Sequence, residues 1–230
     1  MSRIFFENEY VIVVPSFEDV ARHKHSFCHI FFLGQDKDCD EIYVTGSGML
    51  HTMPKREACK LFLMIDPTSD LAAYIQSNLL DGDKPKRMKT TKAFRCEEDA
   101  DEETLKDSVN HWLTENGLRF GKDVNETVED YRFVKLIREI RDYKHLEKRI
   151  DEIATEYNLS ESRLSHAFKE SVGVSLKGYL TIARLKYAYK LVMEGKSKTY
   201  AALEAGFASP SHLAYICKKQ MGISITDVLK

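Results

Sequence analysis

The stretch IDEIATEYNLSESRLSHAFKESVG, residues 150–173, decides the fold of the C-terminal part of the chain. Its first part predicts a helix in which Ala154 is the small residue that a second helix can cross closely. Asn158 follows at the place of a tight turn, and asparagine tolerates a positive φ better than most residues. Ser160 can cap a second helix over about 161–170. The apolar residues of this second helix are Leu164, Ala167 and Phe168. The pattern is that of a helix-turn-helix unit.

The same pattern returns further along the chain. Ala202 is the small residue and Gly206 lies at the turn, four residues later. Ser209 can cap a helix over about 210–220, and Pro210 falls at its first position, where a missing N–H costs nothing. A single unit of this kind is a weak signal, whereas two units on either side of one helix are a stronger one.

The outward faces of the two second helices are polar. The first helix presents Ser162, Arg163, Ser165, His166 and Lys169. The second presents Ser211, His212, Tyr215, Lys218 and Lys219, with Ser209 at its start. Between the two units, residues 175–194 predict a helix about 30 Å long. Adjacent major-groove faces on one side of B-DNA lie about 34 Å apart, so this spacing favours duplex DNA as the partner.

The charge of the chain is unevenly distributed. The 230 residues carry a net charge of −2. Residues 158–230 nevertheless contain eleven basic and only five acidic side chains. A basic segment in an otherwise acidic chain favours a polyanionic partner for that segment.

Residues 159–173 also resemble the first recognition helix of AraC/XylS-type transcriptional regulators. Gly178-Tyr179-Leu180 with Arg184-Leu185 is similar to the start of that family's linker helix. The second unit is similar through Ala205-Gly206-Phe207, Ser211, Lys218-Lys219 and Gly222. The resemblance covers about residues 130–230. It implies a bipartite DNA-binding domain of seven helices in a transcription regulator.

The resemblance also implies roles for the outward residues. Ser162, Ser165 and His166 would contact bases, and serine accepts either kind of base. Arg163 and Lys169 would fix the register on phosphates. The alternative for each of these residues is a solvated helix face.

The second unit departs from the family's pattern. Tyr215 stands where the family commonly has arginine, and Cys217 where it has phenylalanine. Ile225 replaces the usual proline, and Val228 and Leu229 replace aromatic and basic residues. We therefore expect this unit to contact phosphates more than bases, or to bind weakly.

The N-terminal half has the pattern of a β-rich domain. Strands are predicted over 10–14, 30–33, 42–45 and 61–65, helices over 70–80 and 97–116, and a polar loop over 81–92. The layout loosely resembles cupin-like regulatory domains. The predicted class is α+β, with a small cupin-like or jelly-roll-like domain over 1–123 and an all-α domain with two helix-turn-helix units over 130–230.

Histidines in the N-terminal half suggest a metal site as an alternative. His23 and His25 alternate along one segment and so share a face, and His29, His51 and Glu57 are further candidate ligands. The neighbouring residues Arg22 and Lys24 instead favour exposed histidines. We expect no metal and no cofactor on this basis. Cys28, Cys39 and Cys59 are expected to be ordinary thiols rather than a redox switch.

The function predicted from the sequence is that of a sequence-specific transcription regulator in the cytoplasm. The N-terminal domain would bind a small-molecule effector, form a homodimer or contact a partner, and an activator would also contact RNA polymerase. Residues 99–116 carry an apolar stripe that either pairs with a second copy or packs on its own sheet. The stripe consists of Leu105, Val109, Trp112 and Leu113.

The sequence shows no catalytic motif. A phosphate-binding glycine loop, an HExxH pair and a GxSxG elbow are all missing, so we do not expect an enzyme. No apolar run is long enough to span a membrane, and the N-terminus is unlike a signal peptide. Two other functions stay open: a metal-dependent cupin-type enzyme, and a protein-interaction module with degenerate DNA binding.

Overall fold

The computed structural model describes residues 2–15, 22–34, 37–55, 58–95, 97, 99–121, 128–221 and 225. These residues fall into two compact units, one ending at residue 122 and the other running from residue 123 to Ile225. Every strand described belongs to the first unit, and the second is built of helices. The predicted α+β class is confirmed. No helix in the described ranges combines the length and apolarity needed to cross a bilayer.

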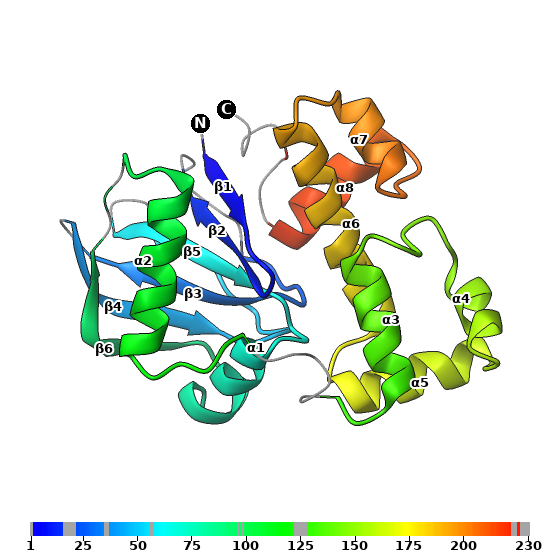
Figure 1. Ribbon diagram of the computed structural model, residues 1–230, viewed down its shortest axis with the longest axis horizontal. Coiled ribbons are helices and arrows are strands. Elements are labelled where there is room, and N and C mark those ends of the chain that lie inside the picture. The colour runs from blue at the N-terminus through cyan, green and yellow to red at the C-terminus, as the bar shows by residue number, and fades with distance from the viewer. Residues whose placement is uncertain are drawn as a thin grey trace. The chain divides into compact units, whose positions relative to one another are not determined.

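The first unit is built on one antiparallel sheet of six strands, in the order β1-β2-β5-β3-β4-β6 (Figure 1). The strands are β1 (Arg3–Phe6), β2 (Tyr10–Val14), β3 (Cys28–Leu33), β4 (Asp38–Thr45), β5 (Cys59–Ile65) and β6 (Lys86–Arg95). All six residues of β3 are buried. Both faces of this central strand are therefore covered, which explains why its sequence is almost entirely apolar.

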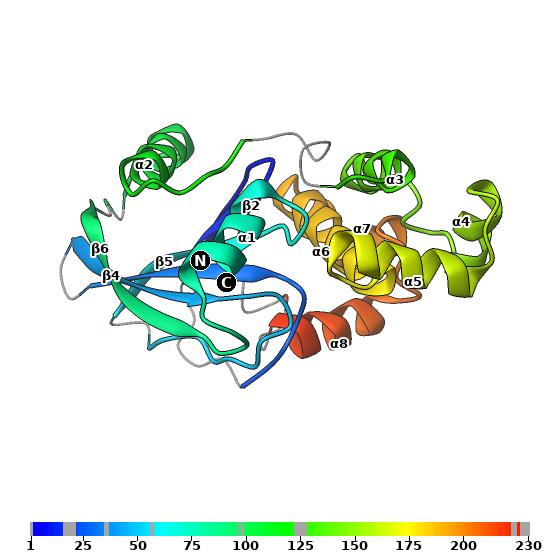
Figure 2. The same cartoon turned by 90° about the horizontal axis from the view of Figure 1, so that it is seen from below.

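One face of the sheet is covered by α2 (Glu102–Glu115), as two views at right angles show (Figures 1 and 2). The helix begins where the Asp101 side chain accepts a hydrogen bond from the Thr104 N–H at 2.8 Å. Its apolar stripe is at most 2% exposed and belongs to the same core cluster as Ile30 and Phe32 of β3. The Trp112 ring lies 4.6 Å from that of Phe32. Of the two alternatives for this stripe, packing on its own sheet is confirmed.

Strand β6 corrects the prediction of a loop over 81–92. Only one of its residues, Phe94, is buried, and the strand lies at an edge of the sheet, so it lacks the apolar alternation of a half-buried strand. Its pairing with β4 also shifts register between Cys39 and Glu41. At this irregularity the carbonyl of Lys92 accepts a hydrogen bond from Trp112 Nε1 at 2.8 Å. Helix α2 thus gives the Lys92 carbonyl a hydrogen-bond donor at the point where the β4–β6 pairing is interrupted.

The segment predicted as one helix over 70–80 is α1 (Asp70–Tyr74) followed by the π-helical turn η1 (Ile75–Leu79). Ser69 caps it, with Oγ accepting from the Ala72 N–H at 3.1 Å. The strand β1 was not predicted, because its four residues are too few to show a period.

The cysteines of the sheet are buried. Cys28, Cys39 and Cys59 form no disulfide and are at most 3% exposed. Burial raises the pKa of Cys28 to about 12, which leaves no thiolate near neutral pH. The three cysteines are thus buried thiols, and the absence of a redox switch stays a prediction.

The second unit packs its first four helices around one apolar cluster. The helices are α3 (Tyr131–Arg141), α4 (Ile150–Glu156), α5 (Glu161–Val172), α6 (Leu176–Met193), α7 (Lys198–Glu204) and α8 (Pro210–Met221). The cluster joins α3, α4, α5 and the first half of α6 through Phe133, Ile153, Phe168 and Tyr179. The ring of Phe168 lies 5.6 Å from that of Phe133.

Candidate nucleic-acid interface and histidine cluster

The first helix-turn-helix unit is formed by α4 and α5. Ala154 is 1% exposed at the crossing, and Asn158 has a φ of 55° at the turn, as its position predicts. Ser160 Oγ accepts from the Arg163 N–H at 3.3 Å and caps α5. The helix ends at Gly173, whose φ of 81° is the left-handed conformation that glycine adopts without strain.

The inward and outward faces of α5 follow the prediction. Leu164 and Phe168 are fully buried, whereas Ala167 is half-buried. Of the five expected contact residues, Ser162, Arg163, His166 and Lys169 are exposed and Ser165 is half-buried. His166 Nδ1 lies 3.2 Å from the carboxylate of Glu170, one turn further along the same face. The α5 residues are therefore together on one accessible face.

The second unit is formed by α7 and α8. Ala202 is fully buried and Gly206 has a φ of 78° at the turn. Ser209 Oγ accepts from the His212 N–H at 3.0 Å, so this half-buried serine caps α8. Ser211, His212, Tyr215, Lys218 and Lys219 are all exposed, and Lys219 Nζ lies 5.9 Å from the centre of the Tyr215 ring.

Helix α6 joins the two units and is buried along most of its length. It has 18 residues, which correspond to about 27 Å. Arg184 of α6 donates from Nε to the carbonyl of Leu146 at 2.6 Å, which fixes the loop before α4. Near its other end the Tyr189 hydroxyl lies 2.7 Å from Cys217 Sγ of α8. The same helix therefore holds both units. Sequence reasoning missed the role of Arg184, because its partner is a distant backbone carbonyl.

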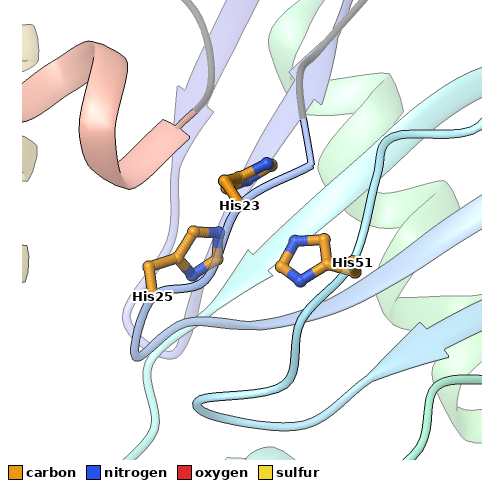
Figure 3. Close-up of side chains that lie close together, drawn as sticks. All are labelled: His23, His25 and His51. Carbon is orange, nitrogen blue, oxygen red and sulfur yellow. The ribbon is translucent and has the colours of Figure 1, made fainter.

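The first unit holds a cluster of four histidines. The rings of His23, His25, His29 and His51 each lie within 5.2 Å of at least one other ring of the group. His23, His25 and His51 point toward one another (Figure 3), and each offers a ligand atom within 4.8 Å of the others. His25 is 5% exposed and His23 is half-buried, so the expectation that both are exposed is wrong for His25.

Burial determines the electrostatics of this cluster. It lowers the pKa of His25 and of His29 well below their usual 6.5, with neighbouring imidazoles adding to the effect. Burial likewise lowers the pKa of His51 to about 4. These three imidazoles are therefore neutral at pH 7, which is the form that binds metals.

Comparison with protein families gives a match for the C-terminal part of the chain. The family described as "Helix-turn-helix domain" matches residues 153–230. Residues 153–230 are an AraC-type helix-turn-helix domain. Domains of this type bind duplex DNA, so the chain contains the DNA-binding part of a transcription regulator. No curated protein matches the chain significantly.

Solved structures of similar fold include that of apo ToxT K231A from Vibrio cholerae. It is 13% identical, with a TM-score of 0.51 over 100% of this chain and 95% of that one. ToxT with a bound unsaturated fatty acid is 14% identical over 97% and 92% of the two chains, with a TM-score of 0.45. The C-terminal domain of AraT, a response regulator from Geobacillus stearothermophilus, is 25% identical. The match covers 40% of this chain and 82% of that one, with a TM-score of 0.37. The likeness to apo ToxT shows a shared fold.

The two outward helices of the AraC-type domain differ in charge. On α5, Arg163 and Lys169 are offset by Glu161 and Glu170. The α8 sequence PSHLAYICKKQM contains Lys218 and Lys219 and no acidic residue. The expectation that the second unit contacts phosphates more than bases, or binds weakly, stays a prediction.

Several residues singled out in the sequence lie outside the described part of the structure. They are Glu57, Gly222, Val228 and Leu229. Ile225, which replaces the family's proline, is described and is 3% exposed. Its side chain is therefore buried rather than available for contact with DNA.

Proposed function

We propose that the chain is a sequence-specific transcription regulator in which α5 contacts bases in one major groove and α8 engages the next groove along. The observation that carries this proposal is the pair of helix-turn-helix units on one buried connecting helix, α6. The length of α6, about 27 Å, is compatible with successive groove faces about 34 Å apart. The exposed polar faces of α5 and α8 supply the contacts.

We assign the contacts by chemistry and charge. Ser162, Ser165 and His166 contact base edges, and Arg163 and Lys169 contact phosphates. On α8, Lys218 and Lys219 contact phosphates, and Ser211, His212 and Tyr215 complete that surface. Ser209 acts through its cap of α8 and lies at the border of the interface.

We propose that residues 1–123 form a regulatory domain and residues 130–230 the DNA-binding domain. The regulatory domain would control DNA binding by binding a small-molecule effector or by forming a homodimer. The regulator acts in the cytoplasm without catalysing a reaction, and in the case of activation it contacts RNA polymerase.

The proposal is tested by selecting binding sites for the full chain from a random duplex library. We expect an enriched motif of about 15–20 base pairs with two parts one helical turn apart. A motif confined to one half-site would show that only α5 contacts bases. No enrichment would contradict the proposal and favour a protein-interaction module.

Substitutions on α5 should separate contacts to bases from contacts to phosphates. His166→Ala and Ser165→Ala are expected to change the selected sequence. Lys169→Ala is expected to weaken binding to specific and to random duplexes alike. It should also make the plot of log affinity against log salt concentration less steep, by about 0.9 in slope. The matched control is Lys144→Ala, which removes the same charge from a side chain 62% exposed outside both helices.

These affinities are measured by fluorescence anisotropy at several salt concentrations. Equal losses on specific and random DNA for all three α5 variants would contradict the assigned roles. An equal change of salt slope for Lys144→Ala would show that the effect depends on net charge rather than on a contact by Lys169.

A further inference from the structure

We propose that His23, His25 and His51 bind one divalent transition-metal ion of the zinc class. Their ligand atoms already lie within 4.8 Å of one another. Tetrahedral zinc with Zn–N bonds of about 2.0–2.1 Å needs nitrogens about 3.3 Å apart. Small side-chain rotations can close this difference. The proposal concerns the N-terminal unit alone and does not depend on DNA binding.

The backbone holds the three histidines on one face. His23 and His51 are directly paired across an antiparallel bridge: the N–H of each donates to the carbonyl of the other, with nitrogen-to-oxygen distances of 2.9 and 3.0 Å. The carbonyl of His25 accepts from the Gly48 N–H at 2.7 Å, which continues the same pairing. Since residues two apart on an extended segment share a face, His23 and His25 lie on the same side as His51 (Figure 3).

His51 presents a nitrogen that is suited to metal binding. Its Nδ1 donates to the carbonyl of Met49 at 2.9 Å, which leaves the lone pair on Nε2. Within the described part of the chain, this Nε2 is buried and has no hydrogen-bond partner. A buried unsatisfied nitrogen is costly, and an ion would satisfy it. A backbone carbonyl behind the second nitrogen is the usual support of a metal-binding histidine.

His29 and His25 form a hydrogen-bonded pair that an ion would replace. His29 Nδ1 donates to the carbonyl of Leu63 at 3.1 Å, so its Nε2 is an acceptor. His25 Nδ1 accepts from the Phe27 N–H at 3.1 Å, and its Nε2 therefore carries the proton and donates to His29 Nε2 at 3.1 Å. Binding through His25 Nε2 moves this proton to Nδ1 and breaks the Phe27 bond. It also leaves the lone pair of His29 Nε2 without its present donor.

The ligand chemistry selects the class of ion. Imidazole nitrogens suit Zn²⁺, Co²⁺, Ni²⁺ and Cu²⁺, whereas Mg²⁺ and Ca²⁺ need oxygen ligands. The clustered donors identified among the described residues are all histidines. An open surface pocket of about 640 Å³ reaches His51 between Arg22, Tyr43 and Leu50 and offers a path for entry.

The test uses the full chain after removal of metals with a chelator. Isothermal titration with Zn²⁺ is expected to show one site. Co²⁺ is expected to give the intense visible absorption bands of a tetrahedral nitrogen site, and Zn²⁺ should abolish them. His23→Gln and His51→Gln should each weaken Zn²⁺ binding by at least about 100-fold. Loss of a group that only hydrogen-bonds to a ligand typically weakens metal affinity by about 10- to 100-fold.

The matched control is His111→Gln, the same substitution at an exposed histidine of α2, whose side chain is 74% exposed. It should keep the full affinity. Fluorescence of Trp112, the single tryptophan of the chain, checks that the N-terminal unit of each variant is folded. Absence of stoichiometric Zn²⁺ binding to the unaltered chain would overturn the proposal. Wild-type affinity in folded His23→Gln and His51→Gln, or Co²⁺ bands of octahedral intensity, would do so as well.

Discussion

Gly206→Ala is expected to lower the free energy of unfolding of the AraC-type domain by about 3–4 kcal/mol. A Cβ at this position would lie 2.9 Å from the carbonyl carbon of Leu146 and closer still to its oxygen. The φ of 78° adds a cost of about 1–2 kcal/mol for any side chain, and forced overpacking adds about 1–3 kcal/mol. The displaced oxygen is also the acceptor of the Arg184 hydrogen bond, so the loop before α4 would move as well.

The control for this change is Gly173→Ala. Gly173 has a φ of 81°, but nothing lies within 4 Å of the added Cβ. It should cost about 1 kcal/mol from the backbone conformation alone. Urea unfolding followed by far-ultraviolet circular dichroism measures both changes. Gly206→Ala should lose duplex binding at a lower urea concentration than Gly173→Ala. Equal destabilisation by the two variants would show that contact with Leu146 does not constrain the turn.

Trp112→Ala is expected to destabilise the N-terminal unit by about 3–5 kcal/mol, the usual cost of removing a buried large aromatic. Trp112 is 2% exposed, packs on Phe32 and donates to the carbonyl of Lys92. Its removal leaves a cavity between α2 and the sheet and takes from the Lys92 carbonyl the closer of its two donors, the other being Asn116 Nδ2 at 3.2 Å. Because the side chain points into its own unit, the oligomeric state of the folded fraction should not change.

The control lies next to it on the same helix. His111→Ala removes an exposed side chain and should change the free energy of unfolding by no more than about 0.5 kcal/mol. Urea unfolding measures stability, and sedimentation velocity measures the oligomeric state. If Trp112→Ala dissociated a dimer without loss of stability, packing on the sheet would be contradicted. The stripe would then be a dimer interface.

The helix-turn-helix units could be predicted from sequence because their determinants are local. Asn158 at the turn, the caps at Ser160 and Ser209 and the glycine at 206 each act within four residues of the chain. The polar face of α5 followed from the helical period alone. Sequence could not show that Gly206 is crowded, because Leu146 lies sixty positions earlier.

The N-terminal unit shows where local patterns fail. β6 was predicted as a loop because an edge strand with one buried residue has no apolar period, and its place in the sheet depends on β4 and α2. The apolar stripe of α2 could be predicted from the sequence. The sequence pattern alone, however, is the same whether the stripe packs on a second copy of the chain or on its own sheet.

The sequence by itself therefore determined the α+β class, the two helix-turn-helix units and the face of α5, since these depend on periods and caps of a few residues. Only the tertiary structure decided what covers Trp112, where β6 pairs and how His51 meets His23 and His25. That meeting depends on a backbone bridge between segments twenty-eight residues apart, with hydrogen bonds that no local pattern encodes.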